Sequence, residues 1–173
     1  MYFKDFDNYS YGTYYGPDRI IPLDEVKMIG WLENGHDYPK GVVDEQTLYY
    51  LRELIVTQRA AEISYRGYHY CDFCERQSSN LDEHPKVKLG SQERSLGCAE
   101  FWLPSLTAPG TFYSAPNLIY HYIVDHGYRP PDEFLEAVNR FPFNLQWNAS
   151  STRQQLVEKH RQRIRDEENK PKN

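Results

Sequence analysis

The sequence predicts an α+β fold: a small, mainly antiparallel sheet with three or four helices, pinned by a zinc site. Three observations predict it. Short alternating segments typical of strands are interleaved with apolar stripes at helical spacing. The length of 173 residues suits one domain that can bury a core without disulfides. Two cysteines and two histidines also have the spacing that zinc ligands prefer.

The first part of the chain predicts short strands and one helix. Residues 1–25 are aromatic, polar and rich in turn formers, which favours loops with short extended pieces. The stretch 26–32 has the apolar character of a strand. Asp44 can cap a helix that runs to about Glu62. The segment 63–70 then alternates like a strand and leads directly into the sequence CDFC.

The middle of the chain predicts a loop, a strand and a helix. The segment 77–95 is polar, so we expect a loop. Residues 96–103 alternate in the manner of a strand, and a short returning strand follows a turn. Ser114 is a candidate N-cap for a helix that ends at Gly127, a residue type suited to the position after a helix.

The last segments predict two helices and divide the chain into a domain and a tail. Two prolines open a helix over about 132–139, and Ser150 or Ser151 caps a charged helix that runs to about Glu168. We therefore expect an α+β domain over 1–150 and a charged helix with a frayed end over 151–173. Four residues form a thin apolar stripe on this helix, so we expect the tail to be dispensable for folding: Leu156, Val157, His160 and Ile164.

Charge and composition exclude several classes of protein. Residues 1–150 contain 21 acidic and 13 basic residues, a net charge of −8, which disfavours nucleic-acid binding by the main domain. No run of about 18 apolar residues is present, and the polar N-terminus lacks a secretory signal. With three cysteines at least one is unpaired, which argues against a disulfide-stapled secreted module. We expect a cytoplasmic protein without membrane contact.

The main chemical signal is Cys71-x2-Cys74 followed by His121-x4-His126. Two thiolates on one turn and two imidazoles from a helix end are the donor set of a tetrahedral zinc site. Residues five apart on an ideal helix differ by about 140° in direction, so His126 should lie where the last turn loosens before Gly127. We predict that these four residues bind one Zn²⁺ ion, which joins a strand and turn to a helix.

Two other interpretations of these residues stay open. Cysteine is a common small core residue, and the helix dipole favours a histidine near a helix C-terminus. A CxxC pair can also be redox-active. Such a pair usually begins a helix in a thioredoxin-like βαβ unit, and the sequence indicates no such unit here.

Five further residues bear on the ligand set. Cys98 could be a third thiolate in place of a histidine, or a free thiol on a strand. His69 could be a ligand, a hydrogen-bond partner of a ligand or a surface residue. His36 lies in a polar loop that could be functional. His84 and His160 lie in highly charged segments, where we expect both to be solvated.

Several segments together resemble a known family. They are MYFKDFDNYSYG, GWLENGHDYPKG, RGYHYCDFC, LGCAEFWLP and TFYSAPNLIYHYIVDHGYRPPDEFLEAV. The sequence resembles uncharacterised bacterial proteins that share a domain of unknown function, over about residues 1–139, most specifically in the HxCxxC and APxLIxHYxxxHGYxPP motifs. The resemblance implies a bacterial, cytosolic, metal-bound protein without assigned activity. It places in recurring segments His36, His69, Cys71, Cys74, Glu100, His121 and His126, whereas Cys98, the insertion 77–95 and the charged tail look particular to this chain.

Three functions are compatible with these features. Four protein ligands leave no position for water, which favours a structural zinc in a protein that acts by binding a protein partner. An immunity-type protein that neutralises a basic toxin is one specific version. A zinc-dependent hydrolase or nuclease requires one open metal position, with Glu100 or His69 as general base. A nucleic-acid-binding module would depend on the tail, whose net charge is +3 but whose charges alternate.

Overall fold

The computed structural model describes residues 2–15, 17, 19–57, 61–74, 84–143 and 147–170. In these residues the strands are β1 (Asn8–Tyr9), β2 (Tyr14–Tyr15), β3 (Arg19–Ile20), β4 (Leu23–Met28), β5 (Glu62–Ser64), β6 (Lys86–Leu89), β7 (Gln92–Ser95), β8 (Ala99–Pro104) and β9 (Phe112–Pro116). The helices are α1 (Glu45–Thr57), α2 (Ile119–His126), α3 (Asp132–Asn139) and α4 (Ala149–Glu168). None of these helices combines the length and the apolar character that crossing a bilayer needs.

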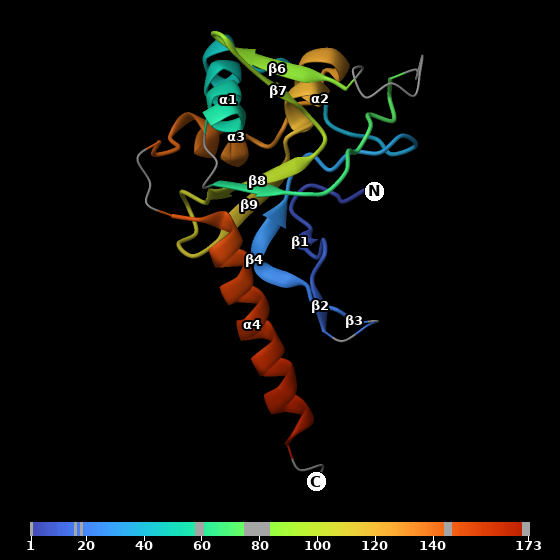
Figure 1. The fold of residues 1–173 in the computed structure, drawn as a ribbon, viewed down its shortest axis with the longest axis vertical. Coiled ribbons are helices and arrows are strands. Elements are labelled where there is room, and N and C mark those ends of the chain that lie inside the picture. Colours follow the sequence, from blue (N-terminus) through green and yellow to red (C-terminus); the bar gives the residue numbers. More distant parts are fainter. Residues whose placement is uncertain are drawn as a thin grey trace.

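A five-stranded sheet with the order β1-β4-β9-β8-β5 forms the centre of the molecule (Figure 1). Only β4 and β9 pair in parallel, with Val26 opposite Phe112, and the other neighbours in this sheet are antiparallel. Two separate hairpins, β2–β3 and β6–β7, complete the strands of the described residues. The predicted class, α+β with a mainly antiparallel sheet, is therefore confirmed.

Both faces of the sheet are buried, as the alternation along β8 shows. Phe101 and Leu103 belong to an apolar core that also contains residues of α1, α2 and α3. Trp102, between them, belongs to a second core that it shares with Ala149 and Val157 of α4. Because successive side chains of a strand point to opposite faces, α1–α3 cover one face and α4 covers the other (Figure 1).

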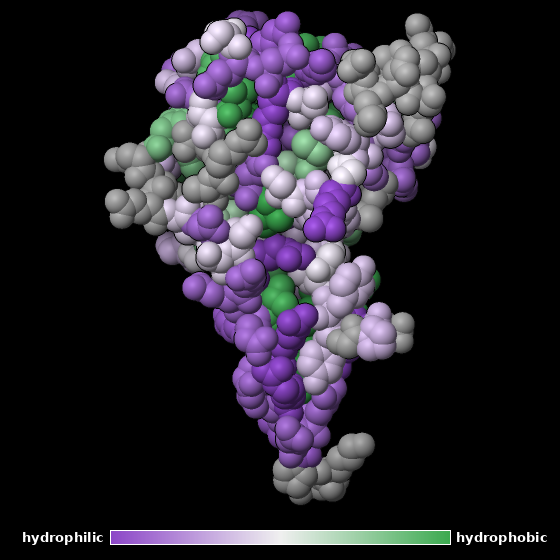
Figure 2. Space-filling view, viewed as in Figure 1, coloured by the Kyte–Doolittle hydropathy of each residue, from purple (hydrophilic) through white to green (hydrophobic). Residues whose placement is uncertain are grey.

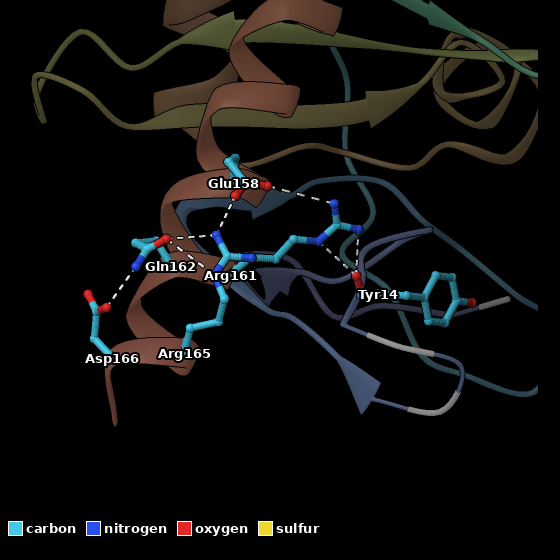
Figure 3. Close-up of polar contacts among 6 residues, drawn as sticks. All are labelled: Tyr14, Glu158, Arg161, Gln162, Arg165 and Asp166. Atoms are coloured by element: carbon cyan, nitrogen blue, oxygen red, sulfur yellow. Dashed lines mark hydrogen bonds and ion pairs between the residues drawn. The ribbon is translucent and has the colours of Figure 1, made fainter. Parts of the chain in front are cut away.

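The C-terminal helix is held to the body by polar contacts as well as by its buried apolar residues Ala149 and Val157. Glu25 of β4 accepts hydrogen bonds from Lys159 Nζ and His160 Nε2, each 2.7 Å long. Arg161 Nη2 donates to the Tyr14 carbonyl at 2.7 Å, and Figure 3 shows this arginine reaching from α4 to the chain that enters the β2–β3 hairpin. His160 is only 6% exposed, so the expectation that it is solvated is wrong.

The far end of α4 extends beyond the sheet beside the β2–β3 hairpin (Figure 1). Hydrophilic side chains cover most of this end in the view of Figure 2. Along the helix, Arg165 Nη2 donates to Glu158 and Gln162 Nε2 donates to Asp166 (Figure 3). The predicted charged helix is thus present, and Asn148 caps it by accepting from the Ser151 N–H instead of a serine doing so.

Two expectations for the middle of the chain are wrong. Residues 86–95 form the hairpin β6–β7 where the polar composition predicted a loop, while residues 77–83 of that prediction lie outside the described residues. Ser114 is not a helix cap but a central residue of β9, where its hydroxyl donates to Glu100. Helix α2 begins only at Ile119, without a side-chain cap.

Strand boundaries also differ from those predicted. β4 spans Leu23–Met28 instead of 26–32, and β5 ends at Ser64 instead of continuing to residue 70. Gly67 has a φ of 106°, a conformation that breaks the extended chain there. The segment after Gly67 is not a strand, but one backbone hydrogen bond fixes it to the start of β8, since the His69 N–H donates to the Gly97 carbonyl at 2.7 Å.

Candidate metal centre

Four side chains converge where the turn after residue 70 meets the end of α2. Cys71 Sγ lies 3.2 Å from His126 Nε2, and Cys74 Sγ lies 3.2 Å from His121 Nε2 and 3.4 Å from His126 Nε2. The two histidine Nε2 atoms are 3.1 Å apart. All four donor atoms lie within 4.8 Å of one another, so this group could hold a metal ion.

These distances resemble the edges of a small tetrahedron. With Zn–S near 2.3 Å and Zn–N near 2.05 Å, an ideal site separates two nitrogens by about 3.3 Å and a sulfur from a nitrogen by about 3.6 Å. In the chain the two nitrogens are 3.1 Å apart, three of the sulfur–nitrogen separations are 3.2 to 3.4 Å, and the remaining pairs lie within 4.8 Å. The donor set and its spacing therefore fit one four-coordinate ion with two sulfur and two nitrogen ligands.

Local structure explains how both histidines of α2 reach one point. His126 is the last residue of the helix, and Gly127 follows it in the left-handed conformation, with φ of 67°. The N–H groups of Gly127 and Tyr128 both donate to the Tyr122 carbonyl, which ends the helix tightly. His126 thus lies in the final turn, and its ring can approach His121, with centroids 4.8 Å apart.

Asp125 orients one of the histidines. Its Oδ2 lies 2.6 Å from His121 Nδ1, one helical turn away. A carboxylate in this position accepts a hydrogen bond from the Nδ1–H group and leaves Nε2 free as a ligand. Many metal-bound histidines have this arrangement. The sequence reasoning missed Asp125. The available signal was its place four residues after His121, on the same helix face.

Burial controls the protonation of the cluster. It raises the pKa of the Cys71 thiol to about 12, so this thiol is protonated at neutral pH unless a cation replaces its proton. Burial and the adjacent His121 lower the pKa of His126, which keeps its imidazole neutral. A metal ion binds neutral imidazole and displaces the proton of a thiol. The protonation states of His126 and Cys71 are therefore compatible with a metal site.

The other candidate ligands lie outside this group. Cys98 is a free cysteine whose Sγ contacts the Ser95 carbonyl at 3.8 Å. His36 stacks on Tyr2 with centroids 3.8 Å apart. The grouping of His, Cys, Asp and Glu side chains in the described residues does not include Cys98, His69 or His36.

His84 corrects a second expectation about solvation. It is 4% exposed and lies between two tyrosines, with ring centroids 4.2 Å from Tyr68 and 4.4 Å from Tyr70. Aromatic neighbours of this kind bury an imidazole by stacking and not by hydrogen bonding. Its charged sequence neighbours gave no sign of this environment.

Glu100 is buried at the centre of a hydrogen-bond network. It is 0% exposed, and its carboxylate accepts from Tyr9 Oη at 2.7 Å, Tyr65 Oη at 2.6 Å and Ser114 Oγ at 2.7 Å. Arg153 of α4 donates to the same Tyr9 hydroxyl at 3.2 Å. Burial raises the pKa of Glu100 although these hydroxyls lower it. Its oxygens are thus occupied by protein donors and do not face the cysteine and histidine cluster.

Residues 1–139 match the model of a family described as a domain of unknown function, DUF7919. The chain belongs to this family. No curated protein and no solved structure matches it. The four residues of the metal centre all lie within the DUF7919 domain, whereas α4 begins after it.

Proposed function

We propose that this DUF7919 protein holds a structural zinc ion and acts by binding another protein. The observation that supports a structural ion is the convergence of four protein donor atoms, which lie within 4.8 Å of one another and are enough to fill a tetrahedral coordination sphere. Two sulfurs and two imidazoles also favour zinc over harder ions, which prefer oxygen ligands. The ion would join the turn that contains Cys71 and Cys74 to α2.

The surroundings of the cluster argue against a zinc-activated water. A catalytic ion needs an open position and a general base beside it. Glu100, the acidic candidate for that role, is buried and occupied by three hydroxyl donors. Within the described part of the chain, a cleft of about 190 Å³ is lined by Tyr122 but by none of the four cluster residues. A substrate in that cleft would therefore not meet the ion.

Cobalt substitution tests the closed site. Protein refolded with Co²⁺ should show the intense absorption of a tetrahedral ion with thiolate ligands, and azide or imidazole should leave the spectrum unchanged. Elemental analysis of the untreated protein should give one zinc per chain. A spectrum that shifts when azide is added would indicate an open position and would favour the hydrolase or nuclease alternative.

The proposed partner is a protein with a basic surface, as in an immunity-type protein that neutralises a basic toxin. The charge of −8 on residues 1–150 supports this, because complementary charge steers association. Retention experiments with the tagged full chain should capture basic proteins and lose them as the salt concentration rises from about 0.05 to 0.3 M. Retention of acidic proteins, or binding that ignores salt, would contradict this assignment.

The proposed location is the cytoplasm of a bacterium. All three cysteines are free thiols, and two of them belong to the cluster that would bind the ion. A reducing compartment preserves such thiols, whereas an oxidising one would pair them. Measuring how fast the zinc-free protein forms a Cys71–Cys74 disulfide under mild oxidant tests how far the site depends on that compartment.

A further inference from the structure

A cleft of about 190 Å³ opens between the segment 65–69, the residues after β4 and the start of α2. Its lining includes five large aromatic side chains, which are Tyr11, Trp31, Tyr65, Tyr68 and Tyr122. Clefts for drug-sized ligands are usually about 300 to 1,000 Å³. The smaller volume fits a compact group of a few heavy atoms.

The aromatic rings are inclined steeply to one another. The Tyr11 ring lies 5.1 Å from the Trp31 ring at an interplanar angle of 47°, and 5.0 Å from the Tyr65 ring at 78°. A flat ligand would require two parallel walls. The three rings instead pack on one another as one continuous aromatic wall of the cleft, and the π faces of such rings attract ammonium groups.

The wall formed by Tyr65 is electron-rich. Its hydroxyl donates to the buried Glu100 carboxylate at 2.6 Å, and the Tyr9 hydroxyl donates to the same oxygen at 2.7 Å. A phenol that donates to a carboxylate gains electron density in its ring, which strengthens its attraction for a cation. The residues that the cleft exposes therefore favour positive charge at this wall.

The charge of Arg66 opposes a cation. Arg66 also lines the cleft, but it is an exposed rim residue, where solvent and salt screen its charge. An anionic ligand would need this arginine, whereas a cationic ligand would bind better without it. Arg66 thus provides a direct way to distinguish the two ligand classes.

We propose that this cleft binds a small organic cation of the quaternary or methylated ammonium class. The inference does not depend on zinc or on the proposed protein partner. The ammonium group would lie against the faces of Tyr11, Trp31 and Tyr65, and its substituents would point out past the rim.

Calorimetry with choline and with its neutral isostere, 3,3-dimethylbutan-1-ol, tests the assignment on the full chain. Choline should bind, and the isostere should bind about three- to thirty-fold more weakly, the loss expected when a cation–π contact is removed. Equal affinities would show a plain apolar cleft and overturn the proposal. Absence of choline binding at millimolar concentration would overturn it as well.

Variants of the lining locate the binding. Tyr11→Leu should weaken choline binding at least three-fold, and Tyr65→Phe should weaken it less, because the ring stays while its bond to Glu100 is lost. Tyr49→Leu is the matched control, since Tyr49 is a 46% exposed tyrosine of α1 outside the cleft. Arg66→Gln should tighten choline binding, and a loss of affinity in this variant would contradict the cationic class. Thermal melts of each variant report folding, and the comparison of choline with its isostere needs no variant.

Discussion

Asp125 contacts Nδ1 of His121 at 2.6 Å, which leaves Nε2 of this histidine directed at Cys74. We expect Asp125→Ala to lower zinc affinity about ten- to a hundred-fold, because the imidazole loses its fixed orientation and part of its basicity. Competition with a chromophoric chelator measures this. Asp132→Ala is a suitable control, since Asp132 pairs with Arg129 instead of a ligand. Equal zinc affinities of the two variants would remove the orienting role of Asp125.

The three cysteines should differ sharply in what they contribute to stability. Structural zinc sites are worth on the order of 10–16 kcal/mol, and whole domains are stable by about 5–15 kcal/mol. Cys71→Ser should therefore give insoluble or largely unfolded protein. Cys98→Ser should cost only about 1 kcal/mol, because Cys98 is a free thiol outside the cluster. A native-like cooperative melt of Cys71→Ser would contradict a structural ion.

Single residues also show what sequence spacing can and cannot predict. Short-range spacing pairs Cys71 with Cys74 and His121 with His126, and the expectation that the two pairs meet came from the donor set that zinc prefers. The environments of His84 and His160 depend instead on residues distant in sequence, such as Glu25 for His160. Charged sequence neighbours predicted solvent for both, and packing overrides that prediction.

Among the elements, α4 contributes more to the packed core than its thin apolar stripe predicted. Arg153 donates to Tyr9 inside the Glu100 network, and Val157 packs in the core with Trp102. We now expect a chain cut after Asn148 to lose soluble, folded protein, because each large apolar side chain exposed costs about 1.5–3 kcal/mol. A chain cut after Arg161 is the control and should melt cooperatively. Unchanged melting of the shorter chain would restore the expectation of a dispensable tail.

The contact between α4 and β4 should weaken in acid. Partial burial raises the pKa of Glu25, but hydrogen bonds from Lys159 and His160 outweigh it and lower the pKa to about 2. A carboxylate whose pKa is lower in the folded state stabilises the fold above its unfolded pKa of 4.5 and loses that contribution as the pH falls toward 2. Melting temperatures between pH 5 and 2 should therefore fall less steeply for Glu25→Gln than for the unaltered chain. Parallel curves would contradict this role.

The hairpin β6–β7 shows why one element escaped prediction. β6 alternates over only four residues, with Val87 buried and Leu89 partly buried between exposed lysines, and β7 has no buried residue. Cross-strand ion pairs join the two strands instead, with Glu93 Oε2 2.9 Å from Lys88 Nζ and Glu93 Oε1 3.3 Å from Lys86 Nζ. Gly90, at a φ of 58°, allows the tight turn between them. The composition of such polar strands is the same as that of a loop, so composition alone does not identify them as strands.

At the scale of the whole molecule, the fold class was predictable and the layering was not. Alternation in the segment around β8 indicated a strand correctly, with Phe101 and Trp102 on opposite sides. It gave no sign that both sides are covered, because polar Glu100 shares the α4 face with Trp102. The parallel pairing of β4 and β9 joins segments far apart in the chain, a relation that local patterns do not contain.

The covering of this second face has a consequence for the family. The DUF7919 match ends at residue 139, ten residues before α4 begins at Ala149. The sheet face that holds Trp102 therefore belongs to the matched domain, and the helix that covers it, α4, lies outside the match. Without α4 this face would be bare in the present chain, and a large bare apolar surface promotes aggregation. The fold of this chain is thus completed by a segment that the family match does not include.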